Sequence, residues 1–221
     1  MRVTTFQRAR SEEQRAARRR AILGTAAAML TEMPVADLSL NELSRRVGLA
    51  KSNVLKYFES REAVLLELFG IEFDAWVEDL REALRGASGS SGQRGALLVD
   101  AVVRTLAARP VFCDLISAQA AVLERNISTD VALTFKRSAL RGYEGLLTVV
   151  IEAVPQIGVQ GASRFIANAS MLAGAIWNHS HPTPAILAAY DADPRLDAIR
   201  QEFTPALHEA LTTLLYGVLP R

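Results

Sequence analysis

Residues 39–62, SLNELSRRVGLAKSNVLKYFESRE, constrain the fold of this chain more than any other stretch. Ser39 stands before Leu40 and three residues ahead of Glu42, which is the spacing of a capping box at a helix N-terminus. Gly48 follows where a helix must stop and reverse in a left-handed conformation, which costs least without a Cβ. The apolar pattern then resumes over a second short helix. The spacing predicts a helix-turn-helix, whose second helix can enter a DNA major groove.

Charge is divided unevenly along the sequence. The net charge of all 221 residues is only +1. Residues 1–60 hold 11 Lys and Arg against 6 Asp and Glu, a net of +5, and the remainder holds 14 against 18, a net of −4. A basic DNA-binding head on a slightly acidic body has this asymmetry. We therefore expect a DNA-binding domain over residues 1–60, with a basic N-terminal arm, and a second domain over residues 61–221.

The remaining sequence keeps the helical period of apolar residues and is divided by prolines. GASGSSG, residues 86–92, has the composition of a flexible linker, and residues 1–13 that of a flexible arm. No segment alternates with a period of two, so nothing favours a sheet. We predict an all-α fold, with an N-terminal three-helix helix-turn-helix domain and a larger C-terminal helical domain. Outside the helix-turn-helix, helices are expected at about 14–33, 60–84, 94–108, 111–125, 129–153, 161–178 and 204–217.

Over about residues 15–70 the sequence resembles the TetR family of transcriptional repressors. The resemblance rests on AILGTAAAMLTE in the first helix, on LSLNELSRRVGLAKSNVLKYF, and on ESREAVLLELF at the start of a long helix. Lys51, Leu55, Tyr57 and Phe58 form its most specific pattern. The sequence departs from residues frequent in the family on the groove-facing helix, which affects the operator sequence rather than the fold; these positions are Ala50, Asn53 and Leu55.

The resemblance implies the partners and the role of the chain. The DNA partner would be a double-stranded, palindromic operator. Two half-sites roughly 34–36 Å apart require a two-fold symmetric protein, so we expect a homodimer. The larger domain would provide dimerisation and bind a small-molecule effector that releases a repressor from its operator. A DNA-binding regulator without a small-molecule ligand remains the alternative.

Candidate DNA contacts follow from residue type and position. The second helix opens with Lys51, Ser52 and Asn53, whose side chains would reach base edges first, because Asn pairs with adenine and Lys donates to guanine. Tyr57 resembles the family tyrosine that contacts a phosphate. A solvated charged face is the simpler interpretation of any one of these groups. The other candidates for phosphate or base contact are Ser39, Arg45, Arg46, Lys56 and Arg61. The arginines before the helix-turn-helix either add contacts or solvate a tail: Arg2, Arg8, Arg10, Arg15, Arg18, Arg19 and Arg20.

Candidate effector contacts are polar or aromatic residues on otherwise apolar helices, since ligand sites combine apolar walls with a few polar groups. Each of them is also explained by packing alone. They are Phe112, Gln119, Phe135, Asn168, Met171 and Trp177.

Other functions have little support in the sequence. His179 and His181 have a chelating spacing, but a zinc site needs three or four ligands, so we expect no metal and no cofactor. No nucleophile-elbow, phosphate-loop or dinucleotide motif is present, so we expect no enzyme, although a helical enzyme remains a weak alternative. The single cysteine, Cys113, fits a reducing cytoplasm. The basic and apolar run 18–30 imitates a signal peptide, but its apolar residues share one helical face. No run has the roughly 18 apolar residues that a membrane span requires.

Overall fold

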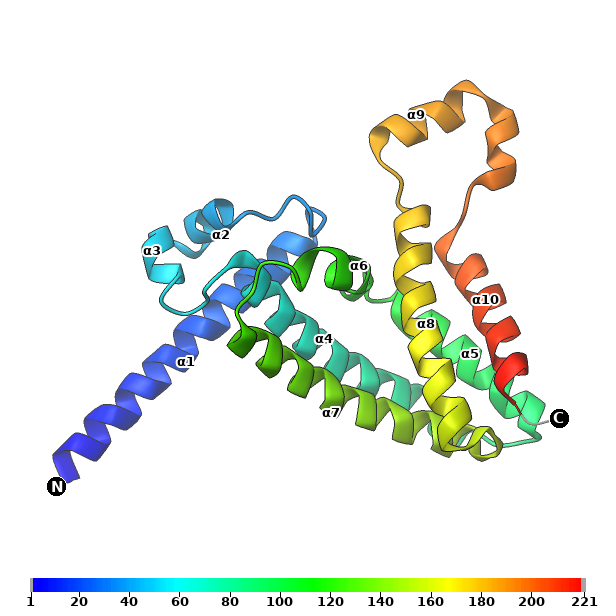
Figure 1. Ribbon diagram of the computed structural model, residues 1–221, viewed down its shortest axis with the longest axis horizontal. Helices are drawn as coiled ribbons and strands as arrows, with labels where there is room; N and C mark the ends of the chain where they lie inside the picture. Colours follow the sequence, from blue (N-terminus) through cyan, green and yellow to red (C-terminus); the bar gives the residue numbers. More distant parts are fainter. Residues whose placement is uncertain (1, 220–221) are drawn as a thin grey trace. The chain divides into compact units, whose positions relative to one another are not determined.

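The computed structural model describes the backbone of residues 2–219 and the side chains of residues 12–219 (Figure 1). The described chain is helical and contains no strand, which confirms the predicted all-α fold. The α-helices are α1 (Arg2–Leu30), α2 (Leu40–Val47), α3 (Lys51–Val54), α4 (Arg61–Ala83), α5 (Ser91–Ala107), α6 (Pro110–Ala118), α7 (Thr129–Ala153), α8 (Gly158–Ser180), α9 (Pro184–Ala192) and α10 (Phe203–Val218). A π-helix, η1 (Gln119–Leu123), and two 3₁₀ helices, η2 (Pro155–Ile157) and η3 (Pro194–Ile199), complete the series.

The chain forms two compact units that do not follow the sequence in simple order. The first unit contains the chain up to Phe69 together with Ala118–Phe135. The second contains Gly70–Ser117 and the chain from Lys136 onward. The helices α4 and α7 therefore contribute residues to both units.

The helix-turn-helix in the first unit packs on α1 and on the start of α4. Ile22 of α1, Leu43 of α2, Val54 of α3 and Leu65 of α4 are all completely buried. Each such apolar side chain stabilises the fold by about 1.5–3 kcal/mol when it leaves water. The short α3 is held in place by this burial, because four residues are too few for a helix that is stable by itself.

Three helices of the second unit, α5, α8 and α10, pack side by side (Figure 1). Near the end of α10, Leu215 lies against Gly95 of α5. At the start of α10, the ring of Phe203 meets Trp177 of α8 edge-on, with the ring centroids 5.0 Å apart. Because the beginning of α10 contacts the end of α8, these two helices are antiparallel.

The helices α4 and α7 run in the same direction along each other. In the second unit Phe73 of α4 faces Gly142 of α7, and one turn later Val77 faces Gly145. A Cβ at position 142 would lie 2.7 Å from the Phe73 ring, so the absence of a side chain allows the close approach. Phe73 also stacks on Trp76 and Phe112, which forms an aromatic cluster with ring centroids 5.7–6.0 Å apart.

Several predicted boundaries differ from the structure. The first helix begins at Arg2, so residues 2–13, predicted to be a flexible arm, have helical backbone. The predicted linker 86–92 ends early because Ser90 caps α5 with a complete capping box to Gln93. The helix predicted over 111–125 changes from α to π geometry after Ala118.

The helix α9 was missed altogether. Its prolines at positions 182 and 184 suggested a break, yet Pro184 occupies the first turn of the helix, where the lost N–H has no helical partner. None of the nine residues of α9 is buried, so the sequence has no apolar stripe that would have revealed the helix.

Candidate nucleic-acid interface

The turn of the helix-turn-helix is fixed by short-range hydrogen bonds. The Ser39 hydroxyl accepts the N–H of Glu42 at 3.2 Å, which caps α2 as predicted. Gly48 has φ +73° and donates its N–H to the Arg45 carbonyl at 3.2 Å, while Leu49 donates to Ser44 at 3.0 Å. These two bonds close a Schellman motif, which satisfies carbonyls that the helix end would otherwise leave unpaired. The predicted glycine turn is confirmed.

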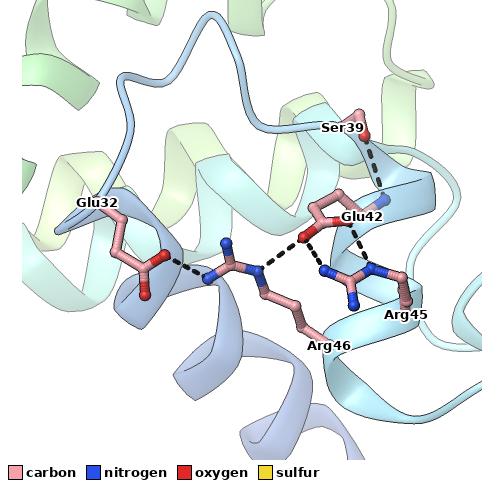
Figure 2. A network of polar contacts seen from close by, with 5 residues as sticks. All are labelled: Glu32, Ser39, Glu42, Arg45 and Arg46. Carbon is pink, nitrogen blue, oxygen red and sulfur yellow. Dashed lines mark hydrogen bonds and ion pairs between the residues drawn. The ribbon is translucent and has the colours of Figure 1, made fainter.

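The second half of the predicted capping box is wrong. The Glu42 carboxylate pairs with two arginines of its own helix (Figure 2), accepting from Arg45 Nε and Nη2 at 2.8 and 2.6 Å and from Arg46 Nε at 2.9 Å. The hydrogen bonds from Arg45 and then Arg46 lower the pKa of Glu42 from 4.5 to about 2. In the bonds to arginine both donor and acceptor are charged, and three of them form, which favours them over a single bond from the uncharged Ser39 N–H.

The two arginines of α2 have different surroundings. Arg46 also binds Glu32 at 2.6 Å, which connects α2 to the segment after α1, and only 28% of its side chain is exposed (Figure 2). Arg45 pairs with Glu42 within this network, and 72% of its side chain is exposed. Arg45 is therefore the more accessible of the two for an outside partner.

The helix α3 has one buried and one exposed side. Val54 is completely buried and Phe58, just after the helix, is almost so. These anchors leave Lys51, Ser52 and Lys56 exposed. The half-buried Asn53 accepts a hydrogen bond from Lys56 Nζ through its Oδ1 at 2.9 Å. The predicted base-contacting residues therefore lie together on one short helix and the turn that follows it.

Two of the predicted phosphate contacts have partners inside the protein. Arg61 donates through Nη1 to the Leu38 carbonyl at 2.8 Å and to the Ala36 carbonyl at 3.3 Å, and so holds the chain that leads into α2. The half-buried ring of Tyr57 has the Arg15 guanidinium 5.9 Å from its centroid.

Arg19 and Glu42 have structural roles that were not predicted from the sequence. Arg19 lies over the Phe58 ring at 4.1 Å, donates to the Tyr57 carbonyl, and pairs with Glu67, so it holds α1 against the helix-turn-helix. These partners are 38 and 48 residues away, and no local pattern predicts them. The ion pairs of Glu42 could have been predicted from the sequence, because Arg residues three and four positions after a Glu form ion pairs on a helix.

The six predicted effector contacts are divided between the two units. Gln119 and Phe135 belong to the first unit and the other four belong to the second. In the second unit Asn168 and Met171 are exposed on α8, with Met171 65% accessible, whereas Phe112 and Trp177 are buried. Helical periodicity alone did not distinguish the outward face of α8 from its packed face.

The described residues contain no group of three or more His, Cys, Asp or Glu side chains that would hold a metal ion. Cys113 is buried beside the Leu106 carbonyl, and burial raises the pKa of its thiol to about 12. No single helix in the described chain is long and apolar enough to span a membrane; α7 and the segment Pro155–Ser180 reach that composition only as a pair bent by 111°.

A capped α2, a glycine turn and an exposed, basic α3 on a common core define a helix-turn-helix DNA-binding domain. Two family models cover nearly all of the chain after residue 21. The model of bacterial regulatory proteins of the tetR family matches residues 22–68, and that of the tetracyclin repressor-like C-terminal domain matches residues 71–221. The chain belongs to the TetR family of DNA-binding transcriptional regulators.

Individual relatives agree with this assignment. The HTH-type transcriptional regulator EthR of Mycobacterium tuberculosis is 44% identical over 48 residues, a match that covers 22% of each chain. The matched segment thus spans about a fifth of the length of this curated relative.

Solved structures share the fold over most of the chain. A TetR transcriptional regulator from Rhodococcus sp. RHA1 has a TM-score of 0.58 at 12% identity, covering 92% of this chain and 95% of its own. A possible TetR family regulator from Streptomyces coelicolor A3(2) has a TM-score of 0.56 at 21% identity, covering 90% and 97%. The fatty acid degradation regulator FadR from Bacillus halodurans has a TM-score of 0.55 at 16% identity, covering 90% and 98%. Because the identities are this low, these structural similarities show a common fold and nothing beyond it.

Proposed function

We propose that this protein is a cytoplasmic, sequence-specific repressor that leaves its operator when a small molecule binds the larger helical domain, residues 61–221. The single observation that carries the DNA-binding part is the exposed polar face of α3. Lys51, Ser52 and Lys56 are exposed there, while Val54 and Phe58 fix the helix from beneath. A rigidly held short helix with polar side chains on its free side is suited to the major groove.

Within this face we assign base contacts to Lys51, Ser52 and Asn53. The Asn53 amide has its oxygen bonded to Lys56, so its nitrogen is the group left to meet a base acceptor. Phosphate contacts are assigned to groups that flank α3, because neutralised phosphates provide most of the affinity and base contacts the specificity. These are the exposed Ser39, Arg45 and Lys56 and the hydroxyl of the half-buried Tyr57. Arg46 and Arg61 support them through their bonds within the domain.

A homodimer on a palindromic operator is the second part of the proposal. Large apolar side chains are exposed on two adjacent helices of the second unit: Val159 and Met171 on α8 are 62% and 65% accessible, and Tyr216 on α10 is 70% accessible. Association of two copies through α8 and α10 would remove these groups from water. Molar mass by light scattering tests this, with M171E/Y216E expected to be monomeric and S88E, at an exposed position between α4 and α5, expected to remain dimeric.

The effector is expected to be a small, largely apolar molecule. The interior of the second unit is apolar, and it includes the aromatic rings of Phe112 and Trp177, so it fits apolar groups better than charged ones. A thermal-shift screen identifies compounds that stabilise the protein, and each hit is then tested for release of DNA. Hits that bind tightly and leave operator affinity unchanged would favour a regulator without a small-molecule switch.

The DNA-binding proposal is tested by selection from a random-sequence duplex library with the full-length protein. We expect enrichment of a palindromic motif, since a two-fold protein binds two equivalent half-sites. The matched control K51A/K56A should enrich no motif. Failure of the unaltered protein to enrich any motif would contradict the proposal.

A further inference from the structure

The unit that contains the helix-turn-helix also contains a segment from the middle of the chain. Ala118–Phe135 includes η1, the loop after it, and the first residues of α7, and it belongs to the same compact unit as residues up to Phe69. Leu123 is completely buried, and within this unit the Phe135 ring meets Phe69 edge-on with centroids 5.5 Å apart. A segment remote in sequence is thus packed with the DNA-binding elements.

A hydrogen bond from the backbone connects this segment to the end of the helix-turn-helix. The backbone N–H of Ser128 donates to Glu59 Oε1 at 2.7 Å, across 69 residues of sequence. Glu59 directly follows Phe58, the buried anchor of α3. The carboxylate is therefore one residue away from the element that positions the DNA-contacting helix.

Ser128 is the N-cap of α7, and one of the two hydrogen bonds of a capping box at this position is made by Glu59, a residue outside the helix. The Ser128 hydroxyl accepts the N–H of Val131 at 3.3 Å, as an N-cap serine does. In a capping box the side chain of that third residue returns a bond to the N-cap N–H, which valine cannot do. Glu59 provides the missing acceptor. Its negative charge also lies near the N-terminus of a 25-residue helix, where the helix dipole favours an anion.

The state of the carboxyl group agrees with this role. The hydrogen bonds from the Ser128 backbone and side chain lower the pKa of Glu59 below its ordinary value of 4.5. The group is consequently ionised, and the bond charge-assisted, at neutral pH.

We propose that Glu59 is a positioning residue that completes the N-terminal cap of α7 and thereby makes the orientation of the helix-turn-helix depend on the position of α7. The helix α7 continues without interruption from Thr129 to Ala153, and most of it belongs to the second unit. A shift of α7 along or about its axis moves the Ser128 N–H, and the helix-turn-helix then either follows or loses this bond. The inference rests on the proposed function, because it describes how the DNA-contacting surface is regulated.

Hydrogen exchange of the full-length protein without DNA tests the connection. In E59A, we expect the amides of Ser128 and Val131, and also those of residues 48–58, to exchange about tenfold faster, because local opening then costs less. E59Q removes the charge but keeps an acceptor oxygen, so its exchange should be close to that of the unaltered protein. D130N removes an acid from the same helix terminus without touching the Glu59–Ser128 bond, and it should leave residues 48–58 unchanged.

The decisive region is 48–58. If E59A accelerates exchange only at residues 128–131, the cap is local and the positioning role is overturned. This outcome does not depend on DNA binding, so it is separate from a failure of the proposed function, in which the unaltered protein enriches no DNA motif.

A second readout is specificity on the selected operator. E59A should bind the operator about tenfold more weakly than E59Q does, while both bind random duplex equally, because the two variants carry the same charge and differ only in the acceptor. Equal operator affinities of E59A and E59Q would overturn the proposal.

Discussion

The helix-turn-helix and the bundle of α5, α8 and α10 are both helical, but different kinds of interaction determine their structures. In the helix-turn-helix the decisive groups are local, namely the Ser39 cap, the Glu42 ion pairs and the left-handed Gly48. In the bundle the decisive contacts join residues far apart in sequence, such as Gly95 with Leu215 and Trp177 with Phe203. Local hydrogen bonds fix the positions of the side chains on the helix-turn-helix surface, whereas apolar packing mainly stabilises the bundle.

The exposed surfaces differ accordingly. The helix-turn-helix presents lysine and arginine side chains to solvent, which suits a polyanion. The bundle presents Val159, Met171 and Tyr216, which suits another apolar surface. We propose that the first surface recognises DNA and that the second associates with another copy of the chain.

The largest effect on stability is expected in the bundle. Leu211 of α10 is completely buried, and L211A should lower the free energy of unfolding by about 2–5 kcal/mol, because it removes apolar contacts and leaves a cavity. Urea denaturation measures this. The control T213A, at an exposed position of the same helix, should change it by less than about 0.5 kcal/mol. Equal, small effects of both variants would contradict the assignment of α10 to the core.

The largest effect on DNA binding is expected in α3. K51A/K56A should weaken binding to the selected operator by about 100-fold, since each contact to a base or phosphate is worth about 1–3 kcal/mol. Fluorescence anisotropy measures the affinity. R85A/R195A removes two exposed positive charges from the second unit and should change the affinity by less than about threefold. Similar losses in both double variants would mean that net charge, rather than α3, governs binding.

A smaller effect on stability is expected at Gly48, in the turn between α2 and α3. In G48A the alanine must adopt φ +73°, which costs about 1–2 kcal/mol for a residue with a Cβ. Thermal unfolding should show this loss. G24A, in the helical backbone of α1 with no atom within 4 Å of an added Cβ, should instead be neutral or slightly stabilising. An unchanged stability of G48A would indicate that the turn rearranges.

The smallest effect on stability is expected from protonation of Glu42, which pairs with Arg45 and Arg46. The arginines lower the pKa of Glu42 to about 2, so its contribution to stability is fully present above pH 4.5 and is lost as the pH falls through about 2. NMR titration of the Glu42 carboxyl carbon should give a midpoint near pH 2, which should return toward 4.5 in R45A/R46A. A midpoint near 4.5 in the unaltered protein would show that these ion pairs do not persist in solution.

The same contrast explains how much the sequence predicted. The cap at Ser39, the turn at Gly48 and the limits of α7 follow from rules that act within a few residues, and the structure confirms them. Two contacts were not predicted, for different reasons. Glu42 pairs with Arg45 and Arg46 on its own helix, where two local rules compete for one carboxylate. Arg61 donates to the Leu38 carbonyl, 23 residues away, which no local rule predicts.

In the larger domain, the helical spacing of apolar residues predicted where helices lie, but it did not predict which side of each helix is packed. Met171 and Trp177 lie on the same apolar helix, yet one is 65% and the other 8% exposed. The helix α9 carries no buried stripe at all, so its existence depends on chain geometry that periodicity does not encode.

The most direct test of the central claim, that the surface of α2 and α3 recognises a DNA sequence, is an anisotropy titration across a salt series with the selected operator and a shuffled duplex of equal length. We predict that the operator is bound at least about 10³-fold more tightly than the shuffled duplex, and that both affinities fall steeply as salt rises. Equal affinities for the two duplexes at every salt concentration would contradict the account.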